Sequence, residues 1–191
     1  MADRDLGAAL VALARNAIGE RFGIAAVGVV SQPALDRPGA TFVTLIQDGE
    51  LRGCIGSLEP RRPLSADVSA NAVAAAFRDP RFPPLATHEF HATSVEVSLL
   101  SPPQAFAVFD EADLARQLRP GVDGIVLQYE ARRATFLPQV WAMLPEPREF
   151  IAALKEKAGL QQDFWAAGVN VARYTVIKWK EQDFAAESAK T

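Results

Sequence analysis

The sequence has very little cysteine and no long apolar run. Its 191 residues include a single cysteine, Cys54, which excludes an intramolecular disulfide and a zinc site built from several cysteines. No apolar stretch reaches the roughly 18 residues of a membrane-spanning helix, so no membrane partner is expected. The N-terminus carries Asp3, Arg4 and Asp5 instead of an apolar signal segment. Together these absences predict a cytoplasmic protein.

An excess of basic charge is also missing. The chain has 20 Lys and Arg residues against 23 Asp and Glu residues, a formal net charge of −3. Nucleic-acid-binding modules are usually basic, so a nucleic-acid partner is disfavoured. The sequence contains neither common form of glycine-rich phosphate loop and no G-x-S-x-G nucleophile elbow. With 49% apolar and 23% charged residues, the composition is that of an ordinary folded domain with its own core.

Hydrophobic periodicity predicts alternating helices and strands. Apolar residues recur from Leu6 to Ala17 on one stripe of a helix over residues 3–22, and Gly23 is placed to end that helix. Further helices are expected over residues 65–77, 110–118 and 147–158. Hairpins are expected over 41–58 and over 124–129 with 134–137, and single strands over 92–100 and 171–180. Residues 185–191 should fray. The predicted fold class is α+β, with antiparallel or mixed sheets flanked by helices.

The hairpin over residues 41–58 allows a prediction of register. Asp48-Gly49 is a strong signal for a two-residue type I′ turn between two apolar runs. Regular pairing around that turn places Ile46 opposite Leu51, Leu45 opposite Arg52, and Val43 opposite Cys54. Because side chains alternate along a strand, Arg52 and Cys54 should share the face of Val43 and Leu45, with Gly53 and Ile55 on the other face.

Cys54 is the leading candidate for chemistry. A thiol becomes a nucleophile when a nearby cation favours the thiolate, and Arg52 lies two residues away on the same strand. Gly53 and Gly56 leave room for a ligand to approach the backbone. The alternative is that Cys54 is a small hydrophobic residue of a central strand, since free cysteines are often buried.

Other candidate groups are polar residues in strands and loops. Glu96 lies between two valines of a half-buried strand and could act as a general acid or base, or simply face solvent beside two serines. Arg81, in the proline-rich stretch 79–85, could form an anion clamp with Arg52 and Arg78, or these arginines could make surface ion pairs. The pair His88 and His91 has weak metal-ligand spacing and no fixed third ligand, so no metal site is predicted.

Five sequence blocks stand out, in order, over roughly residues 6–180: LRGCIG, DPRFPPL, VEVSLLSPP, ATFLPQVW, and KAGL with a following tryptophan. Together they resemble the AMMECR domain family of the AmmeMemoRadiSam system, whose hallmark is LRGCIG. The resemblance implies a single AMMECR-type domain over residues 1–191, made of two lobes with a cleft between them. The larger lobe would hold both chain ends, and the smaller would be inserted. It also implies an association with Memo-type and radical SAM proteins, and it names no reaction and no cofactor.

The resemblance strengthens a site hypothesis. Two glycines weaken a strand, so the motif around Cys54 serves something beyond hairpin formation. The leading hypothesis is an enzyme acting on an unknown small molecule. It would have Cys54 and Glu96 as catalytic residues and a ligand-binding set of Arg52, Gly53, Gly56 and Arg81. The alternatives are a non-catalytic protein-interaction or scaffold module and, less favoured, a nucleic-acid-binding protein.

Overall fold

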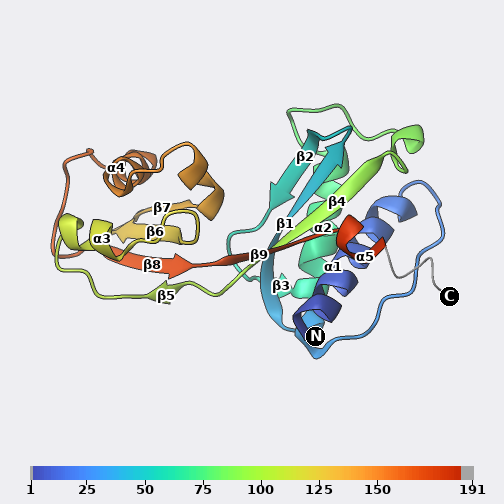
Figure 1. Cartoon of the computed structure of the whole chain (residues 1–191), viewed down its shortest axis with the longest axis horizontal. Coiled ribbons are helices and arrows are strands. Elements are labelled where there is room, and N and C mark those ends of the chain that lie inside the picture. Colours follow the sequence, from blue (N-terminus) through green and yellow to red (C-terminus); the bar gives the residue numbers. More distant parts are fainter. Residues whose placement is uncertain (1, 186–191) are drawn as a thin grey trace. The chain divides into compact units, whose positions relative to one another are not determined.

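The predicted α+β fold is confirmed by the computed structural model, which describes residues 2–185. The chain forms helices and two antiparallel sheets (Figure 1). The chain divides into two compact units. Unit 1 contains residues 2–100 and the described residues from Ile177 onward, and unit 2 contains Ser101–Val176. The cleft expected between two lobes stays a prediction.

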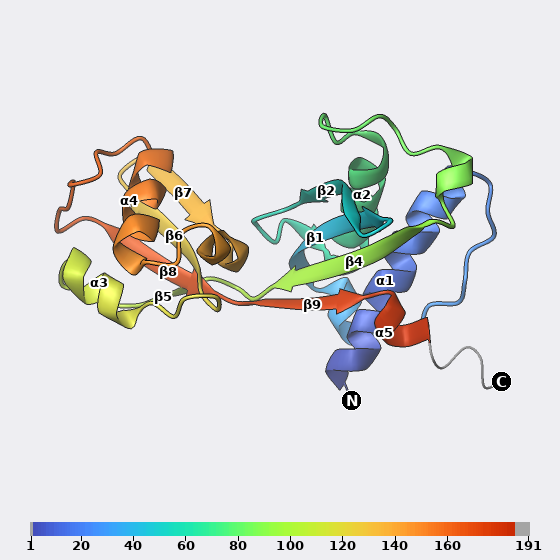
Figure 2. The same ribbon diagram turned by 45° about the horizontal axis from the view of Figure 1, so that its top comes forward.

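Unit 1 is built on a five-stranded sheet with the strand order β2-β1-β4-β9, and β3 pairs with β1. Figure 2 shows β4 and β9 running in opposite directions side by side. The elements of unit 1 are α1 (Ala2–Glu20), η1 (Pro33–Asp36), β1 (Pro38–Gln47), β2 (Glu50–Gly56), β3 (Arg62–Pro63), α2 (Leu64–Phe77), η2 (Thr87–Glu89), β4 (Thr93–Leu100), β9 (Val176–Lys180) and α5 (Gln182–Ala185).

The predicted first helix is confirmed as α1. It ends at Glu20, and Gly23 adopts a φ of 70°, the left-handed conformation that glycine supplies at helix C-termini. The Ile24 amide donates to the Gly19 carbonyl, which closes the last turn. Leu10 and Ile18 are fully buried along its inner stripe. The helix is therefore held by burial of one apolar face.

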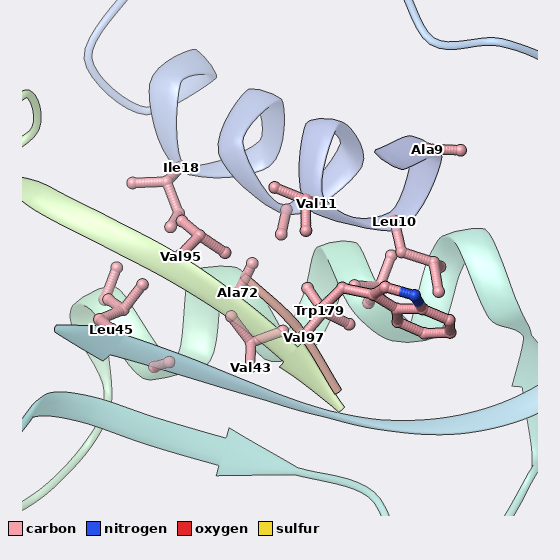
Figure 3. Packing of buried hydrophobic residues seen from close by; sticks show 14 of the residues in the cluster. Ala9, Leu10, Val11, Ile18, Val43, Leu45, Ala72, Val95, Val97 and Trp179 are labelled. Atoms are coloured by element: carbon pink, nitrogen blue, oxygen red, sulfur yellow. The ribbon is translucent and has the colours of Figure 1, made fainter. Parts of the chain in front are cut away.

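The core of unit 1 lies between the two long helices and one face of the sheet (Figure 3). Val43 and Leu45 on β1, with Val95 and Val97 on β4, are fully buried there. Trp179 from β9 joins the same cluster. We call this the inner face of the sheet, and the opposite face the outer face. Because side chains alternate, Thr44, Glu96 and the residues flanking Trp179 belong to the outer face.

The hairpin forms as predicted at its turn but not in its register. Asp48 and Gly49 both have positive φ, 53° and 83°, as a type I′ turn requires, and Ile46 pairs with Leu51. A bulge follows: Leu45 pairs with Gly53 instead of Arg52, and Arg52 is the additional residue.

The bulge reverses the predicted faces of β2. Val43 now pairs with Ile55, and Cys54 pairs with Thr44. A shift of one residue moves every side chain of a strand to the other face. The prediction that Cys54 shares a face with Val43 and Leu45 is therefore wrong: Gly53 and Ile55 take the inner face, and Cys54 lies on the outer face with Thr44.

A buried polar network joins α2 to β1. The Asp67 carboxylate accepts hydrogen bonds from the Thr41 amide at 2.8 Å and the Thr41 hydroxyl at 2.7 Å. Asn71 on the next turn, Ser57 after β2, and Arg62 on β3 also donate to it, at 3.0, 2.8 and 2.9 Å. Asp67 is 1% exposed, so these donors provide the hydrogen bonds that a buried carboxylate needs.

Unit 2 contains the second sheet, with the strand order β5-β8-β6-β7. Phe150, Ile151 and Leu154 of α4 are fully buried and face a cluster that includes Ile125 and Leu127. The elements are β5 (Gln104–Ala105), α3 (Glu111–Gln117), β6 (Gly124–Tyr129), β7 (Arg132–Phe136), η3 (Pro138–Ala142), α4 (Pro147–Lys157) and β8 (Asn170–Tyr174). The predicted helices over 110–118 and 147–158 and the hairpin 124–137 are confirmed, with small changes at their ends.

The single strand predicted over residues 171–180 is wrong. Thr175 interrupts it, so that β8 belongs to the sheet of unit 2 and β9 to the sheet of unit 1. Burial follows the same division, because Val171 and Tyr174 are buried in unit 2 while Trp179 is buried in unit 1. An uninterrupted alternation of side chains does not reveal a strand that changes sheets.

No helix in the described part of the chain is long and apolar enough to cross a membrane. The fraying predicted for residues 185–191 concerns positions that lie, apart from Ala185 at the end of α5, outside the described residues.

Candidate functional site

The outer face of the unit 1 sheet carries a row of polar side chains across three strands. Thr44 on β1 pairs with Cys54 on β2 and with Glu96 on β4. The Thr44 hydroxyl lies 3.3 Å from the Cys54 sulfur. Neighbouring strands are about 4.8 Å apart, so Cys54 and Glu96 stand about 10 Å apart with Thr44 between them. We call Cys54, Thr44 and Glu96 the outer-face row.

Two lysines of β9 extend this row. Lys178 Nζ lies 3.2 Å from Glu96 Oε2, and Lys180 Nζ lies 3.5 Å from Glu96 Oε1. Glu96 is 15% exposed, whereas each lysine side chain is 47% exposed. The carboxylate is thus largely covered, and the two ammonium groups remain accessible to solvent.

The edge strand β2 is held at Cys54 by a clamp from the loop after α2. The Cys54 amide donates to Asp79 Oδ2 at 2.8 Å, and Arg81 Nη2 donates to the Cys54 carbonyl at 3.2 Å. Arg81 also donates to both Asp79 oxygens, at 2.9 and 2.7 Å. An edge strand leaves outward backbone groups unpaired. Here Asp79 and Arg81 pair with those groups at the residue that carries the thiol.

The electrostatics of the clamp favour the charged form of Asp79. Its side chain is 1% exposed, yet the hydrogen bond from the Arg81 guanidinium holds the pKa of this carboxyl far below its usual range, against the opposing effect of burial. The Cys54 amide and the Arg81 amide lower the pKa further. The loop conformation therefore depends on an ionised Asp79.

This dependence gives a test by pH. A carboxyl with a depressed pKa in the folded state stabilises the fold above its unfolded pKa, near 3.9, and that stability is lost as the pH falls toward the folded value. We expect Asp79→Asn to cost about 1–3 kcal/mol at pH 7, because the charged hydrogen bonds are lost.

We also expect the free energy of unfolding of the unsubstituted protein to fall more steeply between pH 5 and pH 3 than that of the variant. Urea unfolding at both pH values measures this, with exposed Asp36→Asn as the control. Equal slopes for the protein and Asp79→Asn would contradict the role given to this carboxylate.

Arg52, predicted to bind ligand, is held by other protein groups. Its Nε and Nη2 donate to the two oxygens of Glu89 at 2.9 and 3.0 Å, and Nη1 donates to the Pro83 carbonyl at 3.0 Å. The bond from Arg52, followed by one from the Ala86 amide, lowers the pKa of Glu89. This bidentate pair ties the bulge to the proline-rich loop, so its guanidinium is engaged in the fold.

The two glycines of the motif face opposite sides of the sheet. A Cβ on Gly53 would lie 2.3 Å from the Ala75 carbonyl oxygen of α2, so the helix approaches the strand as closely as a glycine allows. A Cβ on Gly56 would lie 2.2 Å from the Phe42 ring, which covers this position on the outer face. The structure thus gives each glycine a packing reason, and their ligand-binding role stays a prediction.

Unit 1 also has a cavity of about 430 Å³ beside α1 and the start of β4. The charged side chains that line it are Arg15 and Glu181, and Arg15 donates a hydrogen bond to Glu181 at 2.8 Å. Arg15 also donates to the carbonyls of Phe90 and Thr93. These charges neutralise one another, so the cavity offers a weaker basis for ligand recognition than the outer-face row. Within residues 2–185, no three His, Cys, Asp or Glu side chains converge as metal ligands would.

The structure therefore places Cys54 and Glu96 on one face of the sheet. Arg81 donates a hydrogen bond to the Cys54 carbonyl. Sequence reasoning missed Thr44 and the two lysines as members of the site, and it placed Asp79 in the DPRFPPL block without a role. Lys178 and Lys180 could have been found, because they alternate with Trp179 in a strand that needs one apolar face. Asp79 gives no local signal for its contact with Cys54, which lies 25 residues away in sequence.

Comparisons with known proteins agree over nearly the whole chain. A family model described as AMMECR1 matches residues 11–179. A relative from Sulfolobus acidocaldarius is 38% identical over 169 residues, which cover 84% of this chain and 74% of the relative. One from Methanothermobacter thermautotrophicus is 39% identical over 167 residues, 84% and 85% of the two chains. The crystal structure of the uncharacterized protein PH0010 from Pyrococcus horikoshii has a TM-score of 0.75 and 32% identity, covering 92% of this chain and 91% of its own.

Proposed function

This chain belongs to the AMMECR1 family, and from that premise we propose that it is an enzyme acting on a small molecule, with Cys54 as nucleophile and Glu96 as proton carrier. One observation supports this assignment above all: the register that places Cys54, Thr44 and Glu96 in a row on the outer face. A nucleophile, a hydroxyl and a carboxylate in one line are the groups that covalent catalysis with proton transfer uses.

The groups of the row can carry out acyl transfer. The Cys54 thiol, which lies 3.3 Å from the Thr44 hydroxyl, gives its proton to the Glu96 carboxylate through that hydroxyl and a bridging water, and the sulfur adds to the carbonyl carbon of the substrate as the π electrons move to oxygen. Collapse of this adduct expels the leaving group, which takes the proton from Glu96. Water then cleaves the thioester, with Glu96 taking and returning a proton, and the thiol is restored.

The clamp and the Arg52 pair support this site as positioning groups. Asp79 and Arg81 fix the backbone of Cys54 on both its amide and carbonyl sides. Arg52 and Glu89 hold the adjacent bulge. Reactive side chains require such fixed surroundings to keep a productive geometry. We place the activity in the cytoplasm, where a lone thiol stays reduced. We expect the association with Memo-type and radical SAM proteins that the family resemblance implies.

Thr44→Val tests the reactivity of the thiol. The hydroxyl at 3.3 Å from the sulfur can donate to the thiolate, and a hydrogen bond to a charged group contributes about 1.5 kcal/mol. We expect the variant to react about tenfold more slowly with iodoacetamide at neutral pH, because the hydroxyl no longer stabilises negative charge on the attacking sulfur. Cys54 is the only cysteine, so mass spectrometry of the intact chain follows its alkylation directly.

The control is Ser94→Ala, which removes a hydroxyl from the same strand as Glu96 without a contact to the sulfur. It should leave the rate unchanged. A native thiol that reacts a hundredfold more slowly than the urea-unfolded chain, in both the unsubstituted protein and the variant, would show an inert sulfur and remove Cys54 as nucleophile.

The second candidate is a binding module without chemistry. The observation that favours it is that Arg52, Gly53 and Arg81 of the motif regions already serve packing and hydrogen bonding. The double variant Cys54→Ser, Glu96→Gln separates the two functions. A binding module keeps its affinity for a partner in this variant, whereas an enzyme keeps its fold and loses turnover.

A further inference from the structure

The charges of Glu96 and of the two lysines that extend the outer-face row do not cancel. One carboxylate, Glu96, lies within ion-pair distance of two ammonium groups, Lys178 at 3.2 Å and Lys180 at 3.5 Å. The cluster therefore carries one positive charge in excess. Each ammonium has three donors, and each lysine side chain is about half exposed. Donors that Glu96 does not use consequently face solvent on the outer face.

The distance between the Cys54 sulfur and the lysine ammonium groups limits the length of a ligand that can contact both. The strand order β2-β1-β4-β9 puts Glu96 two strands from Cys54, and the ion pairs bring both lysine Nζ atoms back to the β4 side. The sulfur and the ammonium groups are thus separated by about two strand spacings, or about 10 Å. A small molecule lying over Thr44 can reach both ends.

The charged groups nearest to Cys54 are Asp79 and Arg81 of the clamp, and their charges cancel. Arg81 contacts the Cys54 carbonyl, but both of its hydrogen-bonding arms also bind Asp79. The clamp is therefore a neutral pair, so the excess positive charge on this face belongs to the lysines.

We propose that the outer-face site takes a substrate that is a small carboxylate monoanion, with its carboxylate held by Lys178 and Lys180 and its electrophilic carbon at Cys54. A single excess positive charge matches a monoanion. This inference rests on the proposed function, because Cys54 must be the reacting group.

A pair of alkylating reagents that differ in charge tests the proposal. Iodoacetate is a carboxylate, and iodoacetamide is its neutral counterpart. Iodoacetate is too short to touch the sulfur and the lysines together, so the pair measures the attraction that the excess positive charge exerts on a carboxylate at Cys54 across about 10 Å. In both reactions the sulfur–carbon bond forms as the carbon–iodine bond breaks, iodide leaves, and the thiol proton goes to the buffer. The measured quantity is the ratio of the two rate constants in the native protein, divided by the same ratio for the chain unfolded in urea.

We expect the native ratio to exceed the unfolded ratio by at least about threefold at low salt and to fall toward it as salt screens the lysines. The double variant Lys178→Met, Lys180→Met should lose the preference for iodoacetate, and Lys178→Arg, Lys180→Arg should keep it. Arg37→Met is the matched control for removal of a positive charge. Arg37 directly precedes β1 and lies seven residues before Thr44, about 23 Å away for an extended strand, so this variant should keep the preference.

The outcomes separate the two proposals. If the native thiol reacts readily with iodoacetamide but shows no preference for iodoacetate, the carboxylate inference is overturned and Cys54 keeps its role. If neither reagent modifies the folded protein, the proposed function fails and the inference fails with it. A preference that survives removal of both lysines in a folded variant also overturns the inference, because another group then supplies the charge.

Discussion

Gly53→Ala should lower the free energy of unfolding by about 3 kcal/mol, the upper part of the range for overpacking a tight contact. The added methyl carbon would lie 2.3 Å from the carbonyl oxygen of Ala75 and 3.2 Å from its carbonyl carbon. Backbone atoms of a buried helix turn cannot rotate away as a side chain can. Either β2 or α2 must therefore move by about 1 Å, and the inner-face core between them must loosen.

Gly28→Ala provides the matched control. A methyl group on Gly28 would meet no atom within 4 Å, and this residue lies in the irregular segment before η1. Urea unfolding of both variants, with the slope against urea concentration as a check on cooperativity, gives the two changes in stability. A loss of under 1 kcal/mol in Gly53→Ala would show that α2 does not approach β2 as closely as described.

Asp67→Ala should destabilise the protein by about 3–4 kcal/mol. The substitution leaves the Thr41 amide and the Thr41 hydroxyl without the acceptor that they share in the core, whereas Asn71 still donates to the Thr41 carbonyl. Each buried donor without a partner costs about 1–3 kcal/mol. Arg62 also loses its partner, but its side chain is 42% exposed and can be rehydrated.

Two further variants identify the cause. Asp67→Asn keeps the shape and one acceptor oxygen, so it should cost less than Asp67→Ala. Asp36→Ala removes an exposed carboxylate of the same unit and should change stability by no more than about 0.5 kcal/mol. Thermal unfolding followed by calorimetry gives all three values. If Asp67→Ala and Asp36→Ala melt at the same temperature, the network does not hold α2 to β1.

The secondary structure could be predicted from the sequence because its signals are local. Asp48-Gly49 specifies its turn by the positive φ angles that only a few residue types accept, and the valines of residues 92–100 specify an inner face by alternation. The face of Cys54 could not be predicted, because a single bulge at Arg52 reverses it. That bulge is held by Glu89, which lies 37 residues away in the chain.

The candidate site can be predicted only in part for the same reason. Local surroundings single out Cys54 and Glu96, but what joins them is Thr44, through pairings with two different strands. Sequence periodicity gives the face of a residue within its own strand, not the order of strands in the sheet. The lysines of β9 enter the site only because residues 171–180 divide between two sheets at Thr175.

That division at Thr175 has a consequence for how the chain can vary in evolution. The Ser101 amide donates to the Thr175 carbonyl at 2.9 Å, and the Thr175 amide donates to the Ser101 hydroxyl at 2.9 Å, so the chain enters and leaves unit 2 at one hydrogen-bonded point. The residues of unit 2 thus lie in the sequence between β4 and β9, which are adjacent in the same sheet. Glu96, Lys178 and Lys180 all belong to unit 1. A change in the length or the sequence of unit 2 therefore leaves the residues of these ion pairs unchanged.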